Sequence, residues 1–459
     1  MIILGTNSIK DTGYNVANSA RFDDGSSDYL SKSFSSGNQK TFTFSTWFKL
    51  GSSTDNLTLF ATGADGSNRF WVMRHNESSN NSQIKIDAKT SDSQTIELRT
   101  NASFRDPAAW MHLVVAVDTT QATDTNRVKV YINGSQVTSF NQSTYPAEDH
   151  NTEVNKAAEH RIGRYNAGDN YWDGYMCETV FIDGTQYAAS DFGEFDSDSP
   201  TIWKPKDVSG LTFGTNGAYL DYEDSSALGN DVSGNNNDFT ANNLTAIDQS
   251  TDTCTNNFCT WNPLANYDDG VAFSEGNLVA MSGTNDQWDG GRATMGFSQG
   301  KWYFECLFVA GVSTQYIGVQ DESAGFTGSS PHNQNGTTVF YNNSGGEIRN
   351  DGSATTNDYG TFSSSEVAGI AIDADNFTIS VYKGGSAIVN AYALSTTRTG
   401  FLFPFTTNMM NGDGVKVNFG SPPYSESGGN SDGNGYGNFS MAVPSGYYSL
   451  NTKNLAEFG

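Results

Sequence analysis

Apolar and polar residues alternate along most of the chain, and clusters of Gly, Asn, Asp and Ser interrupt the alternation roughly every 8–12 residues. Residues 41–50 show the alternation clearly, whereas 112–118 are almost continuously apolar, which suits a central strand covered on both faces. Asn133-Gly134 lies between two alternating segments and favours the positive φ angles of a type I′ hairpin turn. Helical periodicity is nearly absent, so the pattern predicts an all-β sandwich or barrel class.

The second half of the chain repeats this arrangement. Within 367–385 an apolar strand ends at Asp373, a short turn follows, and a return strand ends at a Gly-Gly turn. We therefore expect two sandwiches in tandem, joined by a segment rich in Asn, Asp and Ser, with residues 217–222 as a strand that could belong to the first sandwich. The expected divisions are a first sandwich, a connecting segment, a second sandwich and a C-terminal loop or tail, at 1–204, 205–265, 266–425 and 426–459.

The sandwich segments resemble two known families. The first resembles the LamG-like jelly rolls of the concanavalin-A-like superfamily in its opening strand, its F-S-x-W and W-x-H-L strands, its Y-x-N-G turn and its closing segment (19–30, 42–48, 110–118, 130–134, 162–164 and 172–178). The second resembles a SPRY domain, also a concanavalin-A-like sandwich, at 300–305, 317–319, 369–373, 379–383, 403–405 and 415–420. These resemblances imply two concanavalin-A-like jelly-roll β-sandwiches.

The joining and closing segments resemble virion proteins of tailed phages, especially marine ones. This resemblance rests on residues 219–222, 227–239 and 255–264, together with 444–447 and 454–455. It implies a tail fibre, spike or decoration component on the virion. A fold does not fix a function, so this implication is an analogy.

The net charge of the chain argues against nucleic acids and anionic membranes as binding partners. It has 25 Lys and Arg against 51 Asp and Glu, a formal net charge of −26. Binding to nucleic acid requires a basic surface that displaces counterions, and an anionic membrane surface would repel this chain. No segment approaches the ~18 consecutive apolar residues of a membrane span. We therefore expect neither nucleic-acid binding nor membrane insertion.

Catalytic motifs are scarce. Retaining glycoside hydrolysis needs two carboxyl groups about 5–5.5 Å apart, and no apolar strand carries Glu-x-Asp-x-Glu. Glu178 stands alone, Asp373 and Asp375 fall at a turn where Asp is common for backbone reasons, and His112 lies on a core strand. The sequence therefore predicts a non-enzymatic protein, with a glycoside hydrolase as the remaining enzymatic alternative.

Aromatic side chains beside polar loops are the residues that usually bind sugars, and Tyr171 lies beside such a loop. The candidates for ligand binding are Trp71, Tyr165, Trp172 and Trp288. Aromatic residues also pack in the cores of sandwiches, so core packing is the alternative role for each of these four residues.

Ca²⁺ is the cofactor that the loops could hold, because it takes six to eight oxygen ligands. Clusters of Asp and Asn occur at 23–28, 169–173 and 231–238, and Asp169 and Asp173 are the candidate metal ligands. Cys254 and Cys259 lie in one loop-like stretch and either pair as a disulfide or remain thiols.

Together these observations predict a phage virion surface protein, a tail fibre, spike or receptor-binding adhesin, that presents sandwich loops to a host-surface glycan. The expected partners are other virion proteins, a host glycan and further copies of the chain, with a homotrimer as the first guess. Weak sites repeated by symmetry would gain avidity. A structural decoration or adaptor protein and a polysaccharide depolymerase are the alternatives.

Overall fold

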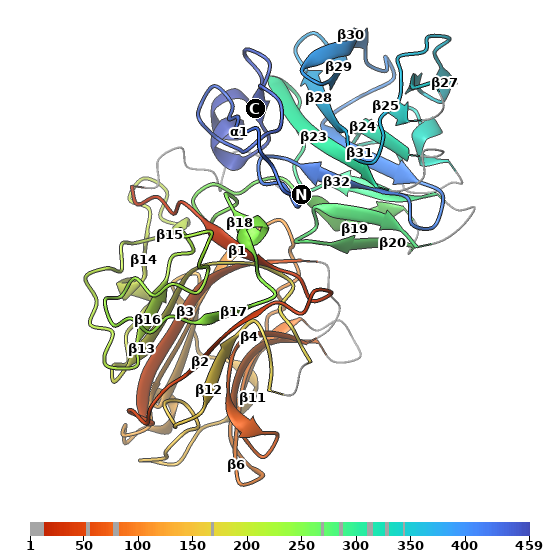
Figure 1. Ribbon diagram of the computed structural model, residues 1–459. Coiled ribbons are helices and arrows are strands. Elements are labelled where there is room, and N and C mark those ends of the chain that lie inside the picture. Colours follow the sequence, from red (N-terminus) through yellow and green to blue (C-terminus); the bar gives the residue numbers. More distant parts are fainter. Residues whose placement is uncertain are drawn as a thin grey trace. The chain divides into compact units, whose positions relative to one another are not determined.

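The alternating segments form two β-sandwiches in the computed structural model, which confirms the expected all-β fold (Figure 1). The structure describes residues 13–51, 56–76, 82–166, 169–267, 270–283, 288–309, 315–325, 330–342 and 345–459. The chain divides into an N-terminal unit that ends at Thr255 and a C-terminal unit that begins at Asn256. None of the helices in this described part is long and apolar enough to cross a membrane.

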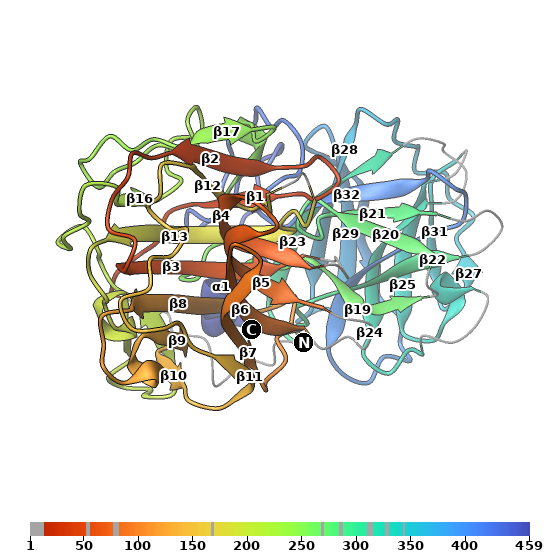
Figure 2. The same cartoon turned by 90° about the horizontal axis from the view of Figure 1, so that it is seen from below.

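The N-terminal unit contains two large sheets, whose strands are labelled in Figures 1 and 2. The first sheet runs, in spatial order, β10 (Ser135–Val137), β9 (Val128–Ile132), β8 (Trp110–Asp118), β3 (Thr41–Leu50), β13 (Gly174–Asp183), β1 (Ser19–Phe22) and β18 (Gln249–Ser250), and β16 (Ala218–Leu220) pairs with β13. The second runs β11 (Phe140–Thr144), β7 (Ser93–Thr100), β6 (Gln83–Thr90), β5 (Asn68–His75), β4 (Leu57–Asp65), β12 (Glu159–Ile162), β2 (Tyr29–Ser33) and β17 (Thr240–Asn242). Short additional elements are β14 (Gly193–Phe195), β15 (Trp203–Pro205), η1 (Asp124–Asn126), η2 (Ala189–Asp191) and η3 (Ala246–Asp248).

Aromatic side chains from both sheets meet in the core of this unit. Phe44 of β3 stacks on Phe60 of β4 with ring centroids 4.9 Å apart, and Phe42 meets Phe70 edge to face. β8 lies between β9 and β3 and is buried on both faces, as its continuous apolar run predicts. This packing of two sheets face to face is what defines a sandwich.

The hairpin predicted at Asn133-Gly134 is confirmed. These two residues connect β9 to β10, and their φ angles are 45° and 78°. A side chain at position 134 would also collide with Trp203, because a Cβ built there lies 2.3 Å from the indole ring. Both the turn geometry and the close packing therefore require glycine at position 134.

The C-terminal unit is built in the same way. One sheet runs β19 (Trp261–Tyr267), β22 (Asp289–Ala293), β31 (Leu402–Asn408), β24 (Gln315–Asp321), β25 (Thr337–Asn342), β26 (Glu347–Asn350) and β27 (Ser353–Ala354). The other runs β20 (Val271–Ser274), β21 (Val279–Ser282), β32 (Gly414–Asn418), β23 (Lys301–Val309), β28 (Val367–Asp373), β29 (Thr378–Lys383) and β30 (Ser386–Ala393), and η4 (Pro331–Asn333) is a short 3₁₀ turn. Phe340 from one sheet and Phe308 from the other both contact Phe362, which joins the sheets across the core.

Residues 426–459, expected as a loop or tail, pack onto this second sandwich. β33 (Tyr448–Ser449) pairs in parallel with β23, and α1 (Thr452–Phe458) inserts Leu455 into the core. The buried Asp432 carboxylate accepts hydrogen bonds from the Ser449 hydroxyl at 2.6 Å and the Asn454 amide at 2.7 Å. These bonds satisfy the buried polar groups of the segment and hold it in place.

The connecting segment 205–265 is divided between the two units. The strand expected near 217–222 is β16, which pairs with β13, while β17 and β18 extend the two sheets of the N-terminal unit at their edges. Residues 256–265 belong to the C-terminal unit. Most of this polar stretch is therefore part of the first sandwich.

Candidate cation and ligand site

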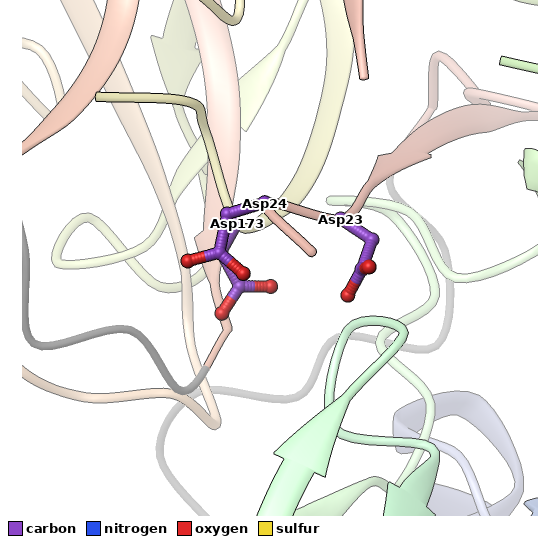
Figure 3. Close-up of side chains that lie close together, drawn as sticks. All are labelled: Asp23, Asp24 and Asp173. Atoms are coloured by element: carbon purple, nitrogen blue, oxygen red, sulfur yellow. The ribbon is translucent and has the colours of Figure 1, made fainter. Parts of the chain in front are cut away.

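Strand pairing brings three aspartates together at one end of the first sheet. Phe22, the last residue of β1, pairs with Gly174, the first residue of β13. Asp23 follows the one strand and Asp173 precedes the other, so the antiparallel register places them side by side. With Asp24, their carboxylates lie within 4.8 Å of one another (Figure 3). The sequence contains these residues in two separate clusters, and the register of β1 and β13 joins them.

The loop around Asp23 is held by its own hydrogen bonds. One carboxylate oxygen of Asp23 accepts from the Ser26 amide at 2.9 Å, and the Asp28 carboxylate accepts from the Asp23 amide at 3.0 Å. Burial raises the pKa of Asp28 to about 6. Asp28 therefore caps the loop from the interior, while Asp24 is partly exposed to solvent.

Asp173 is fixed from the other side. Its carbonyl accepts a hydrogen bond from the Gly51 amide at 2.9 Å, and a Cβ at position 51 would lie 2.4 Å from its carboxylate. Asp173 is buried, and the buried Arg74 of β5 is close enough to interact with it electrostatically. The absence of a side chain at Gly51 thus leaves room for this carboxylate.

An open hollow of about 310 Å³ lies next to the aspartates and is lined by Asp24, Gly25, Asn170 and Tyr171. Tyr171 packs against Tyr29 with ring centroids 6.2 Å apart. The Arg164 guanidinium lies over the Tyr29 ring, 4.3 Å from its centroid. The residues that line the hollow therefore include a carboxylate, a side-chain amide and an aromatic ring.

Oxygen donors at this spacing suit a hard divalent cation. Ca²⁺ accepts carboxylate, amide and carbonyl oxygens, and three carboxylates supply only part of its shell of six to eight ligands. Asp23, Asp24 and Asp173 could hold such an ion and leave further coordination positions open. Vicinal hydroxyl groups of a sugar have the right chemistry to fill them.

Of the two expected metal ligands, Asp173 belongs to this cluster. Asp169 is exposed and does not join it. In the third Asp and Asn cluster, the Asp231 carboxylate accepts from the backbone amides of Tyr219 and Asn237, at 2.9 and 2.8 Å. Asp231 therefore organises a loop through hydrogen bonds to the backbone.

The expected aromatic residues are placed in three different environments. Trp71 of β5 stacks on Tyr165 with centroids 4.0 Å apart, and its indole nitrogen donates to Thr58 at 3.0 Å. Trp172 is fully buried in the first core, where it meets Phe48 edge to face. Because neighbouring residues of an extended chain point in opposite directions, Tyr171 lines the hollow while Trp172 enters the core.

Trp288 belongs to the C-terminal unit. Its ring lies 4.3 Å from His332 and 5.4 Å from Tyr316, which in turn stacks on Tyr341 at 4.2 Å. Arg349 covers the last ring, 5.0 Å from its centroid. Trp288 is thus part of an aromatic group in the C-terminal unit, whereas the three aspartates belong to the N-terminal unit.

The residues considered for catalysis have structural roles. His112 is buried, accepts from the Trp203 indole at 3.0 Å and contacts the Ser45 hydroxyl at 2.9 Å, and burial lowers its pKa to about 3. The Asp373 carboxylate accepts from the amides of Asp375 and Asn376 within the turn, at 3.1 and 2.9 Å. The interpretation of His112 as a core residue and of Asp373 as a turn residue is confirmed.

Residues 24–190 match a family model described as the concanavalin A-like lectin/glucanases superfamily, of the Laminin_G_3 type. The match covers the strands that build most of the first sandwich and confirms the LamG-like resemblance. The N-terminal unit therefore has a concanavalin-A-like fold. No curated protein matches the sequence.

Solved structures resemble the chain at low identity. The SPRY domain of human HERC1 is 17% identical, with a TM-score of 0.27, over 34% of this chain and 96% of that domain. A Bacteroides ovatus protein provisionally described as carbohydrate-binding is 13% identical, with a TM-score of 0.34, over 50% of this chain and 59% of its own. A heptameric SAP-like pentraxin from Limulus polyphemus is 12% identical, with a TM-score of 0.28, over 38% of this chain and 80% of its own. Likeness at this level does not identify a ligand.

Proposed function

We propose that the chain is a non-enzymatic carbohydrate-binding protein whose principal site is the hollow beside Asp23, Asp24 and Asp173. The observation that supports this most is the convergence of three carboxylates next to an open hollow with Tyr171 on its wall. In this proposal Ca²⁺ is held by the carboxylates and the sugar completes its ligand shell. The Tyr171 ring contributes an apolar surface for the sugar face.

The charge of the chain favours one class of glycan. A net charge of −26 repels anionic polysaccharides, except where a bound cation neutralises the local field. We therefore propose neutral hexose or pentose units with vicinal hydroxyls as the preferred ligand. At saturating Ca²⁺, raising the ionic strength should weaken such binding little, because no net charge attraction between the protein and the neutral sugar drives it.

The proposed setting is the surface of a tailed-phage virion, as part of a tail fibre or spike. Repetition of a weak site by symmetry would raise the avidity for a host surface through effective concentration. A decoration or adaptor protein that binds only other virion proteins is the alternative. Localising the chain in a particle map, and measuring its oligomeric state, distinguishes tail, capsid and non-virion settings.

A glycan array with the full chain tests the binding function. We expect binding that requires Ca²⁺, is lost on addition of EDTA and falls at least tenfold in Asp24→Asn and in Tyr171→Ala. Asp198→Asn is the matched control, because Asp198 is exposed in the same unit and undergoes the same change of charge. Release of reducing ends from the bound glycan would instead indicate the depolymerase alternative, and binding unaffected by EDTA and by Asp24→Asn would contradict the proposed site.

A further inference from the structure

Two of the four cysteines meet on the outer face of the first sheet. Cys177 lies in β13 and is fully buried, whereas Cys254 follows β18 and is partly exposed. The two thiols are hydrogen-bond partners, and both pack in one cluster with Val16 and Trp47. All four cysteines are free thiols in this structure.

The pairing considered from the sequence joined Cys254 to Cys259. The structure instead places Cys259 in the core of the C-terminal unit, where its sulfur accepts from the Thr294 hydroxyl at 3.8 Å. Cys254 and Cys259 therefore belong to different units, and the partner of Cys254 within its own unit is Cys177.

The backbone around Cys254 is fixed on both sides of the residue. Two residues before it, the Asp252 carboxylate forms a buried ion pair with Lys49 at 2.7 Å and accepts from the Trp110 indole at 2.9 Å. One residue after it, the Thr255 hydroxyl accepts from the Val16 amide at 3.1 Å and donates to the Val16 carbonyl at 3.2 Å. The Cys254 side chain is thus held in position against β13 before any bond forms.

We propose that Cys177 and Cys254 are a dithiol site that closes to an intramolecular disulfide in the presence of a small disulfide oxidant such as oxidised glutathione. The partly exposed Cys254 reacts first: its thiolate attacks the oxidant, forms a mixed disulfide and releases one glutathione thiolate. The Cys177 thiolate then attacks the Cys254 sulfur, and the second glutathione thiolate leaves. The two thiol protons pass to these leaving groups, so one oxidised glutathione becomes two reduced glutathiones.

Closing this bond would link β13 to the last residues of the N-terminal unit. The enclosed loop spans residues 177–254, and a loop of this length gives a large entropic stabilisation in the chain-closure model. For a unit of this size, the expected rise in Tm on oxidation is on the order of 10 °C. Burial raises the pKa of both thiols, so the exchange in the folded protein should be slow.

The test is peptide mapping of the full chain after incubation with oxidised glutathione, with and without later reduction. We expect a Cys177–Cys254 peptide that is two hydrogens lighter than its separate thiol peptides, a higher Tm, and reversal of both by dithiothreitol. Cys254→Ser should lose the cross-link and the Tm shift, whereas Cys259→Ser should keep both.

Mapping of the wild-type chain is decisive even if Cys254→Ser folds poorly. A Cys254–Cys259 cross-link would overturn the proposal. Thiols at 177 and 254 that remain free after prolonged incubation with excess oxidised glutathione, far beyond the time that oxidises a model dithiol, would overturn it as well. Neither outcome bears on glycan binding, so the two proposals fail independently.

Discussion

Glu178 should make the N-terminal unit less stable as the pH rises through the range from about 4.5 to 7. Glu178 is 5% exposed and has a backbone φ of +49°. Its carboxylate accepts hydrogen bonds from the Tyr219 hydroxyl at 2.9 Å and from the Tyr14 hydroxyl at 3.3 Å. Burial is the main cause that raises its pKa from 4.5 to about 7, and the charges of Asp221 and Glu223 add to this.

The direction of this pH dependence follows from the number of protons that the folded and the unfolded chain bind. The unfolded chain loses the Glu178 proton near pH 4.5, whereas the folded chain keeps it until about pH 7. The contribution of Glu178 to the free energy of unfolding is therefore fully present below about pH 4.5. It falls as the pH approaches 7 and is absent above that value. At about 1.4 kcal/mol for each pH unit, the separation of the two pKa values corresponds to about 3 kcal/mol.

Glu178→Gln removes this ionisation and keeps a carbonyl oxygen that can accept from both tyrosines. We expect the variant to be about 3 kcal/mol more stable than wild type at pH 8 and no more stable at pH 4. Urea unfolding of the reduced chain, read from thiol labelling of the buried Cys177, reports on this unit alone. Glu148→Gln, at an exposed site in the same unit, is the control.

A stability difference between Glu178→Gln and wild type that stays constant from pH 4 to pH 8 would refute this reasoning. Such a result would mean that Glu178 titrates with the same pKa in the folded and the unfolded chain. Asp28, whose pKa burial also raises, contributes to the wild-type pH dependence in the same direction. Because it is present in both proteins, it cancels from the difference.

Three further substitutions test the packing of the N-terminal unit by urea unfolding. Trp172→Ala should lower the unfolding free energy by about 3–5 kcal/mol, because the ring is fully buried, and a loss below 1 kcal/mol would place it outside the core. Gly134→Ala should destabilise the unit by at least ~1 kcal/mol, since the new methyl group meets the Trp203 ring at positive φ; a neutral result would contradict the turn geometry. Lys49→Met leaves the buried Asp252 carboxylate without its cation and should cost about 3–5 kcal/mol, and an unchanged urea midpoint would show that the pair is solvated.

Sequence patterns predicted those parts of the fold that are determined by the burial of apolar side chains and by the backbone angles of a few neighbouring residues. Residues 112–118 became a strand buried on both faces because a continuous apolar run cannot leave either face in water, and Asn133-Gly134 became a hairpin because few other residues accept two consecutive positive φ angles. The C-terminal segment was harder to predict. Its Gly, Asn and Ser residues indicate a loop by composition, but their side chains bond to the buried Asp432.

The candidate site depended on information that no local pattern contains. Asp23 and Asp173 are 150 residues apart, and only the register of β1 with β13 brings their carboxylates together. Asp169 was grouped with Asp173 because the two are close in sequence, yet it lies outside the cluster. Polar neighbours likewise favoured both Tyr171 and Trp172 as ligand contacts, while the alternation of side chains sends only Tyr171 to the hollow.

One strand connects the three chemical features of the N-terminal unit. β13 begins beside Asp173, carries Cys177, and then shifts its register against β3 between Cys177 and Val180, where Glu178 adopts its positive φ. Its first residues pair with β1 and so fix the aspartate cluster, whereas the residues beyond the shift pair with β16. The bulge therefore separates the part of the strand that positions the three aspartates from the part next to the buried carboxylate. A bulge changes the direction of side chains locally while the pairing on either side is kept. This strand can therefore hold a strained, titratable residue without disturbing the register that brings Asp23 and Asp173 together.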